Sequence, residues 1–482
     1  MANKSIKKNY IYNLAYQILL VLTPLITTPY VSRILGADGV GTISYAESIV
    51  SYFVLFATLG ISIFGQREIS YVQDDREKRS AIFWETKALQ VITSAIALTL
   101  YIVLAMFQKN TLLYLVFAFR ILEVLVDVVW LMQGMEEFGI VVARNFIFKF
   151  IGIIYIFLQV KTKDDLIKYV FGYAFFLFLS SLSLWIYVPR YVNKPNFGEI
   201  RPFRNIKVVL ALFVPTIAIQ VYTVLDKTMI GFITRDAFEN GYYEQAIKIS
   251  KLVLMVVTAL GTVMIPRIGY HFGRGETEKV EYYMYRGYRF VWFLGIPLCF
   301  GLIGTAPNFV PWFFGDGFQK VIPLLRILSF LILAIGISNV TGLQYLVPTK
   351  RENLLTLTVV IGAVVNFLCN LVLIHYFQSI GAAVASLTAE TTISLVQIFL
   401  VRRELSFWKI LSSSFTYLVA GGVMLTSLII MSMKLTPSVL HTGIMIAAGG
   451  SLYFLTLLVI RDSFFLENLK SGVGKITARI RK

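Results

Sequence analysis

The chain has 482 residues, of which 57% are apolar and only 15% are Asp, Glu, Lys or Arg. A soluble domain carries roughly a quarter charged residues, so this composition excludes a soluble globular enzyme, a disordered chain and a secreted disulfide scaffold. The formal net charge of +17 does not indicate nucleic acid as a partner, because the basic residues lie in short segments between apolar runs.

Apolar runs long enough to cross a bilayer follow one another along almost the whole chain. A membrane-spanning helix needs about 20 apolar residues. The first run follows Lys4, Lys7 and Lys8 but shows no cleavage pattern, so we predict an uncleaved span and not a signal peptide. The sequence predicts an all-α polytopic membrane protein with about 14 spans, at 9–32, 41–64, 84–107, 111–133, 139–160, 167–188, 208–233, 244–266, 288–312, 321–347, 354–376, 380–401, 410–431 and 438–460.

The loops between these runs predict the orientation of the chain. Taken alternately, the loops on the side of the two termini carry 28 lysines and arginines, whereas those on the other side carry 7. Basic loops stay in the cytoplasm. We therefore predict that both termini are cytoplasmic, and the same bias accounts for most of the net positive charge.

An internal repeat emerges when the chain is shifted by about 200 residues. The segment 41–60 aligns with 242–261, and Arg120-Ile121-Leu122 aligns with Arg326-Ile327-Leu328 at a similar offset. A duplication of six spans gives two parallel repeats related by an axis along the membrane normal. The predicted parts are a first lobe at 1–190, a second lobe at 191–405, two further spans at 406–462 and a basic cytoplasmic tail at 463–482.

Ionisable residues at membrane depth are the informative ones, because each is costly unless it faces a cavity or a partner. The cations outnumber the acids. The cations are Lys87, Arg120, Arg144, Lys149, Lys168, Lys227, Lys248, Lys251 and Arg326, and the acids are Glu47, Glu123, Asp127, Asp226 and Glu390.

The span 111–133 carries a polar stripe on one predicted helix face, formed by Arg120, Glu123, Asp127 and Gln133. Part of this stripe can satisfy itself. The stripe allows a structural salt bridge that locks this helix to a neighbouring helix, or a face that lines a water-filled cavity, and the sequence leaves both open.

Further candidate residues lie on other spans. Lys248 and Lys251 share a helix face, with Glu244 as an alternative partner of Lys248; they either bind an anion or extend toward the outer interface. Asp226 and Lys227 are adjacent and cannot face the same way. The remaining candidates for a cavity that binds pyrophosphate and sugar are Arg33, Arg144, Asn145 and Lys149.

No enzyme or metal motif stands out. The chain has no P-loop, GxSxG, HExxH or CxxC motif. Its two cysteines lie inside apolar runs, and its three histidines are scattered. We therefore expect neither an enzyme nor a metal site.

Several segments together resemble one family. They are the opening segment 8–70, Asp127-x-x-Trp130 with Gln133 to Glu136, Tyr222 to Gly231, Gly241 to Ala246, Pro266-Arg267, and Ile380-Gly381 with Glu390. This set, spread over roughly residues 8–405, is similar to the polysaccharide repeat-unit (Wzx-type) flippases of the multidrug/oligosaccharidyl-lipid/polysaccharide exporter superfamily. The resemblance implies two six-helix lobes around a central cavity, plus two C-terminal helices.

The resemblance also implies a function. It predicts that undecaprenyl-pyrophosphate-linked oligosaccharide, a precursor of capsule or O-antigen polysaccharide, moves to the outer leaflet of a bacterial plasma membrane by alternating access. No cofactor is expected, although coupling to Na⁺ or H⁺ is allowed, with Glu47, Asp127 and Asp226 as candidates. Expected partners are the lipid-linked glycan, membrane lipid and the polymerase or export machinery. A teichoic acid precursor flippase, a peptidoglycan lipid flippase and a drug/cation antiporter stay open as alternatives.

Overall fold

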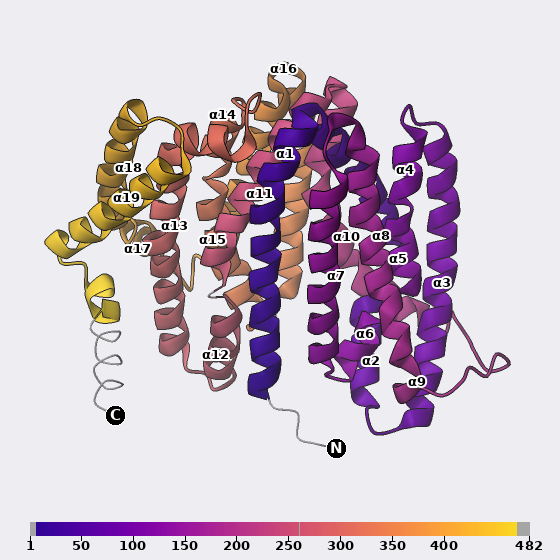
Figure 1. Ribbon diagram of the computed structural model, residues 1–482. Coiled ribbons are helices and arrows are strands. Elements are labelled where there is room, and N and C mark those ends of the chain that lie inside the picture. The colour runs from indigo at the N-terminus through magenta and orange to yellow at the C-terminus, as the bar shows by residue number, and fades with distance from the viewer. Residues whose placement is uncertain (1–5, 260, 470–482) are drawn as a thin grey trace, which may run out of the picture. The chain divides into compact units, whose positions relative to one another are not determined.

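The computed structural model describes residues 6–259 and 261–469, and in these residues the regular structure is entirely helical (Figure 1). The chain divides into two compact units, Met1–Gly241 and Tyr242–Lys482. This division lies beyond the lobe boundary predicted at residue 190, which stays a prediction. Part of the predicted basic tail, from residue 470 on, lies outside the described residues.

Unit 1 contains ten helices and two short 3₁₀ turns in the described part of the chain. They are α1 (Ile6–Thr58), α2 (Ile61–Tyr71), α3 (Arg76–Met106), α4 (Thr111–Phe117), α5 (Phe119–Val126), α6 (Val129–Gly134), α7 (Phe138–Gln159), η1 (Lys163–Asp165), α8 (Leu166–Ser183), η2 (Leu184–Ile186), α9 (Val188–Tyr191) and α10 (Ile206–Thr234). Helix α11 (Ala237–Thr258) begins in unit 1 and continues in unit 2.

Unit 2 continues with further helices. They are α12 (Gly261–Gly273), α13 (Thr277–Phe314), α14 (Val321–Leu328), α15 (Leu331–Thr341), the π-helical turn η3 (Gly342–Leu346), α16 (Glu352–Leu400), α17 (Phe407–Ser412), α18 (Phe415–Lys434) and α19 (Val439–Ile460).

Each predicted span coincides with one or more of these helices. Within the described residues, nine helical stretches are long and apolar enough to cross a membrane. Two of them contain a sharp internal break, at Gly36 of α1 (φ 70°) and at Gln378 of α16 (φ 55°). A positive φ suits glycine, so Gly36 allows the chain to turn between two spans. The protein is an integral membrane protein, and the number of crossings stays a prediction.

Local signals explain where several helices begin. The Asp75 carboxylate accepts a hydrogen bond from the Lys78 backbone N–H at 3.0 Å and caps α3, and Ser438 caps α19 in the same way. Bonds from Lys78 stabilise the charged form of Asp75 and lower the pKa of its carboxyl group.

The predicted repeat reappears in the helix bounds. The part of α1 that follows the break ends at Thr58, and α11 ends at Thr258, 200 residues later. The next helices, α2 and α12, begin at Ile61 and Gly261, which are again 200 residues apart. The short helices α5 and α14 begin at Phe119 and Val321, at nearly the same offset.

The predicted continuous helix over 111–133 is wrong. Helix α5 ends at Val126, Asp127 is extended (φ −62°, ψ 132°), and α6 begins at Val129. The Asp127 carboxylate accepts a hydrogen bond from the Val129 N–H at 3.0 Å, a local bond that competes with helix formation. Asp127 and Gln133 therefore do not continue the helix face of Arg120 and Glu123.

Small residues bring α1 and the first turn of α11 into backbone contact within unit 1. An ideal Cβ built on Gly41 would lie 1.6 Å from the Ala237 carbonyl oxygen, and one on Gly241 would lie 2.0 Å from that of Ala37. The two Ala-x-x-x-Gly segments therefore cross so closely that neither glycine position has room for a side chain.

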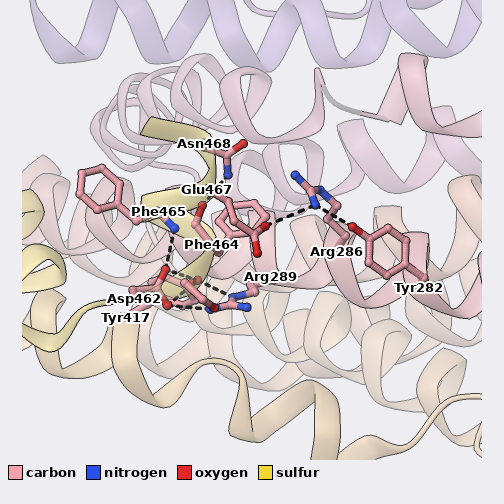
Figure 2. Close-up of polar contacts among 10 residues, drawn as sticks. Tyr282, Arg286, Arg289, Tyr417, Asp462, Phe464, Phe465, Glu467 and Asn468 are labelled. Carbon is pink, nitrogen blue, oxygen red and sulfur yellow. Dashed lines mark hydrogen bonds and ion pairs between the residues drawn. The ribbon is translucent and has the colours of Figure 1, made fainter. Parts of the chain in front are cut away.

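In unit 2, α13 packs against α18 and α19, the two helices predicted to lie outside the repeat. Their core contains buried aromatic residues, including Tyr288, Tyr417 and Tyr453. Just after α19, the Asp462 carboxylate accepts hydrogen bonds from Arg289 Nη2 (2.7 Å), the Tyr417 hydroxyl (3.3 Å) and the Phe465 N–H (2.8 Å) (Figure 2).

Replacing Asp462 with alanine should destabilise this corner of unit 2. The change leaves Arg289 without its carboxylate and the buried Tyr417 hydroxyl without one acceptor, which is expected to cost about 2–4 kcal/mol. Thermal unfolding of the purified protein in detergent measures the effect. Glu467→Gln is the control, because Glu467 lies 3.8 Å from Arg286 and its side chain is 64% exposed; an equal loss in both variants would contradict the anchoring role.

Candidate functional site

Arg120 and Glu123, three residues apart on α5, form an ion pair. Arg120 Nη1 lies 2.7 Å from Glu123 Oε2, and about a fifth to a quarter of each side chain is exposed, 21% and 24%. This distance is that of a strong charge-assisted hydrogen bond. Part of the stripe thus pairs within itself, whereas a salt bridge to a neighbouring helix and a cavity-lining role for these residues both stay predictions.

Tyr173 of α8 connects this pair to α1. Its hydroxyl donates to Glu47 Oε1 at 3.0 Å, and the Arg120 guanidinium lies over its ring, 5.6 Å from the centroid. Three helices of unit 1 thus bring together two carboxylates, one guanidinium and one phenol. We call Glu47, Arg120, Glu123 and Tyr173 the unit 1 cluster.

The interactions within the unit 1 cluster are coupled to one another. A phenol that donates to a carboxylate, beside a second carboxylate already paired with arginine, gives groups whose interactions depend on one another. Addition of a proton or a cation at Glu47 would change its bond to Tyr173, on which Arg120 packs.

The broken span brings Asp127 close to α3. Lys87 of α3 donates to the carbonyl oxygens of Leu125 and Asp127, at 2.7 and 3.0 Å, and its side chain is buried. The Asp127 carboxylate accepts from the Val129 N–H instead. Gln133 lies on α6, half-buried, and is separated from Asp127 by the break.

Helix α7 carries three predicted candidates. Arg144 donates from Nη1 to the Ser180 carbonyl oxygen of α8 at 2.8 Å. Asn145 and Lys149, one helical turn apart, are both half-buried. Arg33 lies on α1 just before the break at Gly36 and is exposed.

In unit 1, hydroxyl groups lie on and beside α10, next to the predicted residues Asp226 and Lys227. Asp226 is buried and Lys227 is half-buried. Near them, Thr228 Oγ1 lies 3.1 Å from the Tyr52 hydroxyl and donates to Ser48 Oγ at 3.0 Å, which links α10 to α1.

In unit 2, the predicted alternative partner of Lys248 is confirmed. Lys248 Nζ lies 3.4 Å from Glu244 Oε1, one turn earlier on α11. Lys251, one turn further on, is exposed. The structure thus places these two lysines on one helix, with one of them already in an ion pair.

A cavity of about 510 Å³ opens in unit 2, between α13, α17 and the segment after α19. Figure 2 shows the contacts of Arg286, Arg289 and Glu467, which line it. Its cations face acids: Arg286 lies 3.8 Å from Glu467, and Lys409 lies 3.5 Å from Glu281. The count of lysines and arginines that predicts the orientation of the chain treats these basic residues only as loop residues. In the part of the chain that is described, no three His, Cys, Asp or Glu residues are grouped to hold a metal.

The contacts of two residues in these sites, Tyr173 and Lys87, are not evident from the sequence pattern. Tyr173 is one of 26 tyrosines, and its partner Glu47 lies 126 positions away. Lys87 stands out as a cation at membrane depth, but nothing in its neighbourhood indicates that its acceptors are main-chain carbonyls of a broken helix.

Comparisons with known proteins agree with this architecture. The family described as "Polysaccharide biosynthesis protein" matches residues 6–271, more than half of the chain. A protein of Shigella dysenteriae named "Putative O-antigen transporter" is 24% identical over 390 residues, which are 79% of this chain and 96% of that protein.

Solved structures show the same fold. The structure titled "Lipid II flippase MurJ, inward closed conformation" has a TM-score of 0.73 at 16% identity, covering 94% of this chain and 99% of that one. An inward-facing multidrug resistance MATE family transporter has a TM-score of 0.64 at 14% identity, with coverages of 84% and 98%. The chain belongs to the family of polysaccharide biosynthesis proteins.

Proposed function

We propose that the protein is a flippase that moves an oligosaccharide linked to a polyprenyl pyrophosphate from the cytoplasmic to the outer leaflet of a bacterial plasma membrane. The observation that carries the proposal is the unit 1 cluster, a group of charged residues held among apolar spans in a member of this family. Membrane proteins keep such groups where a polar substrate or ion passes. The name of the O-antigen relative and the fold of the lipid II flippase support the same activity.

The substrate determines which groups are needed. A pyrophosphate requires cations, and sugars require hydrogen bonds and aromatic faces. We assign the pyrophosphate to cations on α1, α7 and α10 in unit 1 or on α11 in unit 2, and the sugars to Asn145 and to tyrosines. The cations are Arg33, Arg144, Lys149, Lys227, Lys248 and Lys251.

Transport of this kind makes and breaks no covalent bond, so the proposed activity is not enzymatic. With both termini in the cytoplasm, an interior-negative potential favours outward movement of an anion by about 2.3 kcal/mol per charge per 100 mV. Coupling to Na⁺ or H⁺ through Glu47 or Asp226 is part of the proposal, and a coupling role of Asp127 stays a prediction of the sequence. The product in the outer leaflet would be the substrate of a polysaccharide polymerase or export complex.

Reversal of the charge at Lys227 or Lys251 should abolish glycan export while the protein stays folded and inserted. An acid at either position would repel the pyrophosphate. Lys248→Glu would also face Glu244, so it is tested together with Glu244→Gln. The measurement is surface glycan in a flippase-null strain, alongside the amount of folded protein in the membrane.

Lys434→Glu provides the matched control, because this exposed lysine ends α18, outside the predicted repeat. It should export glycan like the wild type. Normal export by all of the Lys227, Lys248 and Lys251 variants would exclude the cationic assignment.

A further inference from the structure

At the break in the span, side chains from other helices donate hydrogen bonds to the main-chain carbonyl groups. Gln90 Nε2 donates to the Val124 oxygen at 2.7 Å, and Trp185 Nε1 donates to the Val126 oxygen at 2.7 Å. Lys87 serves the remaining two, those of Leu125 and Asp127. A helix end at membrane depth needs such partners, because water does not reach it.

Lys87 occupies the centre of this arrangement. Its ammonium has three oxygen atoms within 3.2 Å, because Gln90 Oε1 joins the two carbonyl oxygens, and the residue is only 4% exposed. Three acceptors match the three N–H donors of an ammonium group. The ring of Trp185 lies 5.3 Å away and adds a cation–π contact.

The oxygen set is of the kind that binds a small monovalent cation. Main-chain carbonyls of an unwound segment and the C-terminal end of a half-helix, where the helix dipole is negative, coordinate such ions in membrane transporters. Here Leu125 and Asp127 supply the carbonyls, and α5 supplies the helix end. The Asp127 carboxylate adds negative charge next to this site.

We propose that the break between α5 and α6 is a monovalent-cation site that the protein fills permanently with its own Lys87 ammonium. Lys87 is then a tethered cation that holds the broken span in shape. The main-chain oxygens at this break consequently bind no free Na⁺ ion, which leaves Glu47 and Asp226 as candidates for Na⁺ coupling. This last consequence rests on the proposed function, whereas the site itself does not.

Removal of the ammonium should create a vacant site that a small amine can refill. In Lys87→Ala, we expect the unfolding midpoint of the purified protein in detergent to fall by at least about 5 °C. Propylammonium, which matches the lost side chain, should restore most of this loss. Tetramethylammonium carries the same charge but no N–H donor, so it should not.

Two further proteins complete the test. The wild type should not respond to propylammonium, and Lys87→Met, whose side chain fills the space without donors, should be destabilised and not rescued. A wild-type midpoint for Lys87→Met, or equal rescue of Lys87→Ala by both amines, would overturn the proposal. If Lys87→Ala accumulates only when propylammonium is present during expression and purification, that dependence is itself the expected rescue; if it fails to fold with the amine present as well, the proposal is overturned.

The coupling consequence has its own test. Asp127→Asn keeps an oxygen to accept from the Val129 N–H but removes the charge. Under the proposal, this variant keeps any Na⁺ dependence of transport that the wild type shows. Loss of that dependence in Asp127→Asn would overturn the tethered-cation role, whereas absence of transport in the wild type would count against the proposed function and leave the unfolding result to decide the cation site.

Discussion

Substitution of Gly41 by alanine is expected to remove most of the folded protein. The added methyl group would lie 1.6 Å from the Ala237 carbonyl oxygen, about 2 Å closer than nonbonded atoms pack. The obstacle is main chain, so no side-chain rotation relieves it, and α1 would have to move away from the start of α11. Gly241→Ala should have the same effect, because its methyl group would lie 2.0 Å from the Ala37 oxygen.

The measurement is size-exclusion chromatography of the detergent-extracted protein, followed by thermal unfolding of any monodisperse fraction. Gly422→Ala is the matched control in α18, since no atom lies within 4 Å of its added carbon. Alanine is the better helix former by about 1 kcal/mol, so this control should be neutral or slightly stabilised. Wild-type yield and unfolding for Gly41→Ala would contradict the close helix crossing.

Arg120→Met is expected to have the second largest effect. It leaves the Glu123 carboxylate without its cation at membrane depth and removes the group that packs on Tyr173. The pair is partly exposed, so the expected loss of stability, about 2–3 kcal/mol, lies between those of surface and buried pairs. Transport should be lost as well.

The double variant Arg120→Met/Glu123→Leu separates stability from function. Because Glu123 is then no longer a carboxylate without its cation, the unfolding temperature should rise above that of Arg120→Met, toward that of the wild type. Its flipping activity should remain absent if the unit 1 cluster takes part in transport. A stable double variant with normal transport would show that the pair is only structural.

Spacing along the chain predicts the local part of this architecture. The all-helical membrane fold follows from the apolar runs, and the pairs Arg120–Glu123 and Glu244–Lys248 follow from their separations of three and four residues. The glycine at position 36 similarly matches the turn between the first two spans.

Contacts between distant segments could not be predicted from the pattern. The bonds from Tyr173 to Glu47 and from Lys87 to Leu125 join residues 126 and 38 positions apart, and many polar residues could have formed either. The break at Asp127 did have a signal in the sequence, because an aspartate side chain readily accepts a hydrogen bond from the backbone N–H two residues on. The helical spacing of the polar residues in this span pointed to a continuous helix instead.

The most direct test of the proposed function is a flipping assay in proteoliposomes. They contain a fluorescent undecaprenyl-pyrophosphate oligosaccharide, and an impermeant quencher reports the leaflet in which it lies. The proposal predicts that the protein exposes protected lipid to the quencher, and that an inside-negative potential accelerates this movement. No movement of that lipid, together with efflux of a lipophilic cation against a Na⁺ or H⁺ gradient, would contradict the proposal and identify a drug antiporter instead.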